Sequence, residues 1–179
     1  MIFIGGAPAI GKSTIAKAVA AELGIQSVDF SEIMAKHLPK EPNPKQILRS
    51  TSPHKREKAR LKVVRELERI RSPTLVTGHY GLATFDSRGV KSLEVTFPKE
   101  LVEVTTALAL LRRSKPLVSR DSDFSRFRIS SAIEEAVFRH LELTTELPAI
   151  RLSLDRTSEA TARLLAFVKK ITGSVSRSR

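Results

Sequence analysis

The sequence predicts an α/β fold: a mostly parallel five-stranded sheet with helices on both faces, in three layers. Short apolar runs alternate with longer segments of helical periodicity, which is typical of parallel strands joined by right-handed crossovers. A glycine-bounded loop separates the first apolar run from the first helical segment. The length of 179 residues, 41% of them hydrophobic, suits one domain with one core.

The first strand and helix flank a recognisable loop. Residues 1–4 form the strand, and apolar residues at helical spacing continue to Gly24, a natural helix stop. Between them, residues 6–13 fit G-x-x-x-x-G-K-S, the phosphate-binding P-loop. Such a loop wraps a polyanion with backbone N–H groups and a helix N-terminus. The predicted architecture is therefore the three-layer P-loop NTPase fold.

The loop also predicts the cofactors, which are ATP and Mg²⁺. Lys12 supplies a positive charge for the β- and γ-phosphates, and the Ser13 hydroxyl can ligate the metal. The expected nucleotide-binding residues are Gly6, Ala7, Pro8, Ala9, Ile10, Gly11, Lys12, Ser13 and Thr14.

A basic, largely helical region follows. Residues 26–30 predict a second strand, and Ser31 is expected to cap a short helix that ends near Leu38. Residues 39–45 contain three prolines and predict a connector. Ser52 and Pro53 then start a long helix that continues to about residue 71. Residues 36–71 hold 12 Lys or Arg against 4 Glu, a local net charge of +8.

The second half of the chain predicts three more strands. Residues 74–80 form the third strand, and a loop follows around residues 86–89. Of two strand-like runs, 93–97 and 101–106, we expect the second in the central sheet, because residues 107–113 look like its crossover helix. The carboxyl ends of the strands would then bring together the P-loop, Asp29, His79 and residues 105–106.

The C-terminal third predicts helices around one last strand. Residues 114–128 are polar, and the capping-box spacing of Ser131 and Glu134 predicts a helix that starts there and reaches about residue 145. A strand over 149–154 and a helix over 158–172 follow, and residues 173–179 look like a flexible basic tail.

Composition limits the function. The net charge of +12 favours anionic partners, nucleotides first and RNA as a further partner to test. The absence of cysteine excludes disulfides, thiol catalysis and cysteine-based metal sites. Because there is no long apolar run and no signal-peptide pattern, we expect a cytoplasmic protein with no membrane association.

The sequence lacks the Asn-Lys-x-Asp motif with which GTPases recognise guanine, which favours a small kinase. With the motifs above, the chain resembles archaeal-type adenylate kinase and, more distantly, the nuclear adenylate kinase linked to ribosome assembly. The resemblance covers about residues 1–172, and its strongest parts are the P-loop, 28–34, 72–79, 104–113, 120–123 and 133–135. It implies one kinase domain over 1–172, with an acceptor-binding insert at about 31–71 and a lid at about 114–128. The implied reaction is ATP plus AMP to two ADP.

The resemblance also implies roles for individual residues. The catalytic candidates are Lys12, Arg120, Arg126 and His79, with Arg113 as a third lid arginine. Asp29 and Arg49 are the candidates for substrate binding. For each arginine the alternative is a solvated surface charge, and for His79 a structural hydrogen bond. Tyr80 is an additional candidate for stacking on a base. Relatives of this type are often trimers, which leaves an oligomer open.

Two positions depart from the family pattern. Relatives have Asp-x-His at the end of the third strand, whereas this chain has Thr77 two residues before His79. Asp29 could substitute for the missing acid, or the Mg²⁺ site could be weaker. Ala9 replaces a usual loop glycine, which we expect to be tolerated if its φ angle is negative.

Three alternatives to a nucleoside monophosphate kinase stay open. The basic region suggests an ATP-dependent RNA or ribosome-assembly factor, and Thr77 suggests a nucleotide-binding protein with little catalysis. A kinase of another small acceptor is the third alternative, because the acceptor pocket cannot be read from the sequence.

Overall fold

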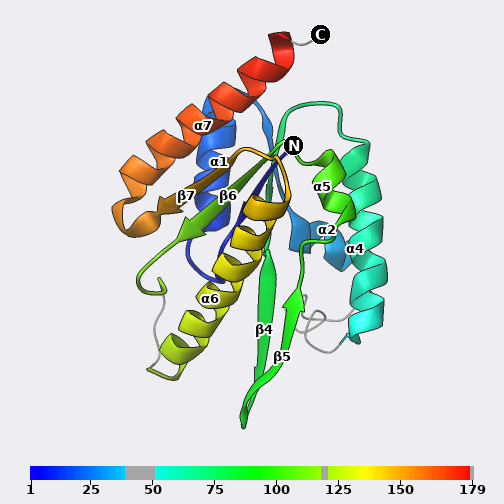
Figure 1. Cartoon of the computed structure of the whole chain (residues 1–179), viewed down its shortest axis with the longest axis vertical. Coiled ribbons are helices and arrows are strands. Elements are labelled where there is room, and N and C mark those ends of the chain that lie inside the picture. The colour runs from blue at the N-terminus through cyan, green and yellow to red at the C-terminus, as the bar shows by residue number, and fades with distance from the viewer. Residues whose placement is uncertain (39–50, 118–120, 178–179) are drawn as a thin grey trace.

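The structure, a computed structural model, describes residues 1–38, 51–117 and 121–177. Its centre is a five-stranded parallel sheet with the strand order β2-β3-β1-β6-β7 (Figure 1). The strands are β1 (Ile2–Gly5), β2 (Gln26–Asp29), β3 (Thr74–Thr77), β6 (Ala107–Arg112) and β7 (Ala149–Ser153). The predicted α/β fold with a parallel sheet is confirmed.

Helices cover both faces of this sheet. The described helices are α1 (Lys12–Leu23), α2 (Phe30–Lys36), α4 (Pro53–Glu68), α5 (Glu100–Val104), α6 (Asp121–Thr144), the 3-10 helix η1 (Leu154–Arg156) and α7 (Thr157–Arg177). Alternate residues of β1 point to opposite faces: Ile2 and Ile4 join the core under α1 and α7, whereas Phe3 joins the core under α2, α4 and α5. The molecule therefore has three layers.

Two neighbouring elements are exchanged relative to the prediction. Residues 101–104, expected in a strand, lie in α5, and residues 107–112, expected in a helix, form β6. Alanine and leucine have high helix propensity, and periodicity cannot separate a short buried strand from a helix. Residues 107–111 are all buried, which a central strand between two parallel neighbours satisfies. Tertiary burial overrides local propensity here.

This exchange changes which residues reach the carboxyl edge of the sheet. Thr106 lies before β6, at the opposite edge, where its N–H donates to the Met1 carbonyl over 2.7 Å. The expected convergence of residues 105–106 with the P-loop is therefore wrong. Arg112 and Arg113, at the end of β6, occupy that position instead.

A separate antiparallel hairpin of β4 (Gly81–Asp86) and β5 (Gly89–Val95) follows β3. The loop expected around residues 86–89 contains its turn, and residues 93–95 of the strand-like run 93–97 lie in β5, outside the central sheet. The hairpin lies between α6 and α4 (Figure 1). A Cβ atom at Gly81 would lie only 2.3 Å from the Ile133 side chain, so α6 approaches the β4 backbone closely. On the other side, Glu94 of β5 pairs with Arg56 and Arg60 of α4.

Helix ends also differ from expectation. The side chain that caps α2 is Asp29, not Ser31. Helix α4 ends at Glu68, and α7 continues through Arg177, past the end predicted at residue 172. The flexibility of residues 173–179 stays a prediction. Helix α6 runs unbroken from Asp121, so the predicted start at Ser131 is wrong. Among the described residues, no helix is both long and apolar enough to cross a membrane.

Candidate functional site

The loop between β1 and α1 has the backbone that phosphate binding requires. Three of its residues have positive φ angles: Gly6 at 146°, Ala9 at 58° and Gly11 at 95°. A Cβ atom at Gly6 would lie 2.3 Å from the Leu111 carbonyl oxygen, so only glycine fits there. Gly11 is the N-cap of α1, whose N-terminus carries a partial positive charge. The loop therefore presents a helix N-terminus and a tightly turned backbone at the carboxyl edge of the sheet.

Lys12 folds back over this loop. Its ammonium group donates to the carbonyl oxygens of Gly6, over 2.7 Å, and Ala7, over 2.9 Å. Burial lowers the pKa of Lys12 to about 8, although the carboxylates of Glu134 and Asp29 act in the opposite direction. The site thus holds a cation at low local dielectric, where its attraction to a phosphate is strong.

Asp29, at the end of β2, lies in a cluster of hydroxyl groups. Its Oδ2 atom accepts hydrogen bonds from Ser13 and Thr77, both over 3.1 Å. Its Oδ1 atom accepts from the N–H and the hydroxyl of Ser31. Burial acts to raise the pKa of Asp29, but these hydrogen bonds outweigh it, and the pKa lies below its ordinary value. A carboxylate thus lies beside Ser13 even though position 77 carries none.

A buried carboxylate of α6, Glu134, also belongs to this region, although its sequence pattern predicted a capping box. Glu134 of α6 is 1% exposed, accepts a hydrogen bond from the Tyr80 N–H over 2.8 Å, and contacts His79 Nδ1 over 2.5 Å. The signal was available in the sequence: Glu134 interrupts the apolar stripe of Phe127, Phe138 and Leu141 at helical spacing. An acid in such a stripe predicts a buried polar partner.

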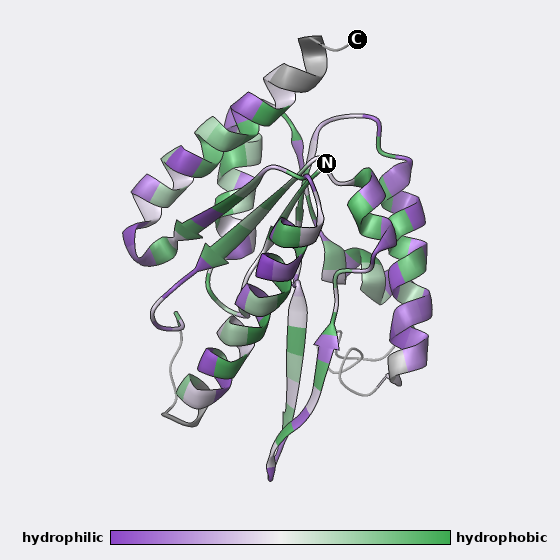
Figure 2. Ribbon diagram, viewed as in Figure 1, coloured by the Kyte–Doolittle hydropathy of each residue, from purple (hydrophilic) through white to green (hydrophobic). Residues whose placement is uncertain are grey.

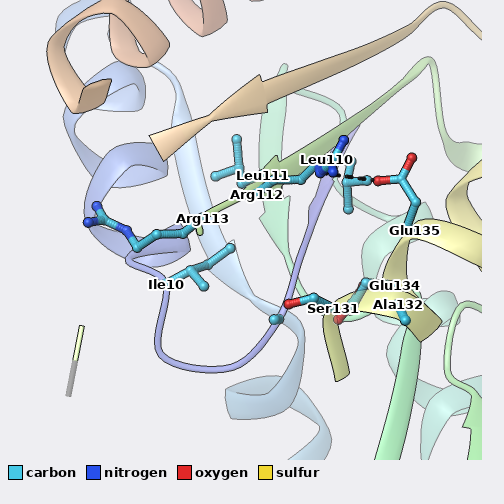
Figure 3. Close-up of a pocket in the computed structure, with 10 residues that line it drawn as sticks. Ile10, Leu110, Leu111, Arg112, Arg113, Ser131, Ala132, Glu134 and Glu135 are labelled. Carbon is cyan, nitrogen blue, oxygen red and sulfur yellow. Dashed lines mark ion pairs between the residues drawn. The ribbon is translucent and has the colours of Figure 1, made fainter. Parts of the chain in front are cut away.

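A cavity of about 230 Å³ opens between the loop, the end of β6 and α6. Figure 3 shows Ser131 and Glu134 of α6 facing Ile10 across it, while Arg113 points away from α6. The buried carboxylate and the P-loop therefore border the same cavity.

The structure describes two of the four arginines that were predicted for the lid and the acceptor site. Arg126 lies in α6, where its guanidinium is 5.5 Å from the centre of the Phe85 ring of the hairpin. Arg113 donates to the Thr157 hydroxyl over 3.3 Å. Arg120 and Arg49 lie outside the described residues. The predicted lid roles of Arg113, Arg120 and Arg126 and the predicted substrate-binding role of Arg49 stay predictions.

Tyr80 is a core residue. Its ring is fully buried, and its hydroxyl is within hydrogen-bond distance of the carbonyl oxygens of Phe3 and Ala109. The idea that it stacks on a base is therefore wrong, since the ring has no exposed face.

Alanine at position 9 was expected to be tolerated if its φ angle is negative. The φ angle of Ala9 is instead 58°, in the left-handed region. We expect Ala9→Gly to raise the free energy of unfolding by about 1 kcal/mol, since glycine adopts this conformation without the Cβ clash. Urea denaturation measures the change. Ala7→Gly is the matched control: Ala7 is buried with no positive φ, so it should lower stability. Equal destabilisation by both variants would contradict the assignment of strain to Ala9.

No protein-family model matches the chain, and no curated protein matches its sequence. Solved structures do match its fold. A gluconokinase from Sinorhizobium meliloti 1021 is 14% identical with a TM-score of 0.57, and the match covers 99% of this chain and 95% of that one.

Two shikimate kinases match similarly. The enzyme from Aquifex aeolicus is 15% identical with a TM-score of 0.55, covering 94% of this chain and 96% of that one. The enzyme from Bacteroides thetaiotaomicron is 13% identical with a TM-score of 0.57, covering 96% and 97%. At these identities the likeness shows that the chain has the fold of these kinases.

Proposed function

We propose that this chain is an ATP- and Mg²⁺-dependent phosphotransferase that acts on a small molecule, and that its acceptor is a nucleoside monophosphate, AMP in the first instance. The observation that carries the proposal is the half-buried Lys12 ammonium in a positive-φ loop at a helix N-terminus. The fold shared with proteins described as gluconokinase and shikimate kinase supports the transferase class. The motifs that resemble adenylate kinase support the acceptor.

The donor set fits Mg–ATP. Gly6, Gly11 and the α1 N-terminus suit a polyphosphate, and Lys12 supplies its counter-charge. Ser13 and Asp29 are the hard oxygen groups beside the loop that would hold Mg²⁺, Asp29 through water. Bound Mg²⁺ supplies charge neutralisation on the phosphates. The chain's own task is to align the acceptor with the γ-phosphorus, so that its oxygen forms the new P–O bond while the bond to ADP breaks.

We propose that Asp29 serves in place of the acid missing at position 77. Asp29→Asn should raise the Mg²⁺ concentration needed for half-maximal turnover by about 10-fold, since outer-shell carboxylates contribute that much to metal affinity. Asparagine is an equally good helix cap, so the fold should be retained. Glu32→Gln, an exposed neighbour with the same charge change, is the control and should cause no shift. Equal Mg²⁺ requirements in all three proteins would exclude this role for Asp29.

A second acceptor class, a small molecule with a hydroxyl group, is favoured by the His79–Glu134 pair. A monophosphate oxygen is already ionised and needs no base, whereas a hydroxyl must lose its proton as the P–O bond forms. A histidine held at Nδ1 by a carboxylate leaves Nε2 to take that proton. Dependence on His79 therefore separates the two classes.

The test is an acceptor panel with purified protein and Mg–ATP, containing nucleoside monophosphates, gluconate and shikimate, with ATP alone as the hydrolysis control. We expect ADP formation from ATP plus AMP, and His79→Asn should lower that rate by less than about threefold, because no proton is abstracted. Transfer only to a hydroxyl acceptor, lost in His79→Asn, would establish the second class. No transfer to any nucleoside monophosphate would overturn the first.

ATP affinity should depend on pH through Lys12, whose pKa of about 8 lies below its ordinary 10.5. Affinity should be constant below about pH 8 and fall by up to tenfold per pH unit above it, as the ammonium loses its proton. The free energy of unfolding should change in the opposite direction. Between about pH 8 and 10.5 the unfolded chain binds more protons than the folded chain, so the free energy of unfolding rises with pH. Titrating ATP at pH values above the phosphate pKa measures this. In Lys12→Arg, ATP affinity should no longer fall above about pH 8. If ATP affinity depends on pH as in the wild type, the titration belongs to another group.

A further inference from the structure

Helix α4 carries a straight line of cations on its outer side. Lys55, Lys58, Lys62 and Arg65 follow one another at spacings of three, four and three residues, and Arg69 at the helix C-cap continues the series. This spacing puts them on one face of a helix, over about 21 Å of its length. All five are exposed. We call these five residues the basic stripe.

Within the part of the chain that the structure describes, no acidic side chain neutralises the basic stripe. Its five side chains form no ion pair or hydrogen bond there, although three carboxylates lie on the same helix: Glu57 and Glu68, both exposed, and Glu66, which pairs with His37. By contrast, Arg56 and Arg60, on the side of α4 that faces the hairpin, pair with Glu94. Figure 2 shows hydrophilic colour along the length of α4. The structural cations of α4 thus have partners, whereas the stripe directs its charge outward.

The chemistry of this face selects the kind of partner. The large exposed apolar side chains of the described residues all lie outside α4, so the helix lacks the apolar face that a membrane-surface helix inserts. Its sequence has no Phe, Tyr or Trp for stacking on bases. Without an apolar face or aromatic side chains, the outer side of α4 offers only a row of positive charges. Such a row suits a partner with regularly spaced phosphates.

We propose that the basic stripe binds the phosphodiester backbone of a nucleic acid, electrostatically and without base recognition. The net charge of +12 assists by attracting polyanions over longer distances. The stripe lies on the opposite side of α4 from the pairs with Glu94, so the proposal does not depend on ATP binding or on the identity of the acceptor.

The expected strength follows from counterion release. Each phosphate that the protein neutralises adds about 0.7 to the slope of log affinity against log salt for a single strand. The triple variant Lys58→Gln, Lys62→Gln, Arg65→Gln should therefore lower that slope by about 2. At about 0.1 M salt it should weaken binding on the order of 100-fold.

The test measures fluorescence anisotropy of a labelled single-stranded RNA and a labelled duplex DNA against the full chain, over a range of salt concentrations. The two probes separate RNA from DNA as the source of the phosphates. The matched control is Lys17→Gln, Arg163→Gln, Lys169→Gln, which removes the same charge from exposed positions on α1 and α7. It should change affinity by less than about threefold and leave the salt slope unchanged.

Thermal melting shows whether each variant is folded, and substitutions at exposed positions should change stability little. Equal loss of affinity in both triple variants would overturn the proposal, since it would assign binding to net charge alone. So would a wild-type protein that binds neither probe, or one that binds vesicles containing anionic lipid but no nucleic acid.

Discussion

Lys12→Ala is expected to lower ATP-dependent phosphoryl transfer by roughly a thousandfold, the loss typical when one preorganised charge-stabilising donor is removed. The ammonium lies at the centre of the loop, next to the carbonyl oxygens of Gly6 and Ala7, where phosphates would compete for it. Burial penalises its charge in the free protein, and the carboxylates of Glu134 and Asp29 offset this penalty in part, so an approaching phosphate stabilises the cation further. Initial rates with Mg–ATP and the best acceptor measure the effect.

The control for this substitution is Lys17→Ala, which removes the same charge from an exposed position of the same helix. It should change the rate by less than about twofold, because an exposed charge is screened by solvent and salt. If Lys12→Ala keeps more than a tenth of the wild-type rate, the nucleotide phosphates bind elsewhere and the proposed function loses its main support. Circular dichroism distinguishes this loss of activity from loss of folding.

The parts of the site that are local in sequence could be predicted. The residue types and spacing of 6–13 alone predict phosphate binding. Gly24 ends α1 with a φ angle of 63°, as expected for a glycine at a helix C-terminus. The position of Asp29 at the end of β2 also followed from the alternation of strands and helices. Each of these three features depends on contacts within a few residues of the chain, so a local sequence pattern can predict it.

The parts that depend on tertiary contacts could not be predicted in the same way. Residues 107–112 became a strand because β1 and β7 flank them, and no local pattern encodes those neighbours. The left-handed φ angle of Ala9 reflects the tight path of the loop rather than the preference of alanine. Glu134 pairs with His79, 55 residues away, so its place in an apolar stripe predicts a buried polar partner but not which residue that partner is.

Glu134→Ala is expected to lower the free energy of unfolding by about 3 kcal/mol, because it leaves a buried donor without an acceptor. The donor is the Tyr80 N–H, and the substitution also removes the partner of His79 Nδ1. Urea denaturation measures the loss. The neighbouring Glu135, about a third exposed and paired with Arg151 on the surface, is the control: Glu135→Ala should cost less than about 1 kcal/mol. Equal losses would mean that burial does not distinguish the two carboxylates.

Glu134→Gln separates this structural role from a role in the reaction. The amide oxygen can still accept from the Tyr80 N–H, so we expect a loss of only about 1 kcal/mol. Its NH₂ group would instead donate to His79 Nδ1, which moves the imidazole proton to Nε2 and removes the base. With a hydroxyl acceptor the rate should then fall by two or more orders of magnitude, since a wrong histidine tautomer lowers the rate of a serine protease by about 10⁴-fold. With AMP it should stay within about threefold, since a phosphate acceptor needs no base. A large loss with AMP would contradict the assignment of Glu134 to positioning His79 and would place its carboxylate in the transfer step itself.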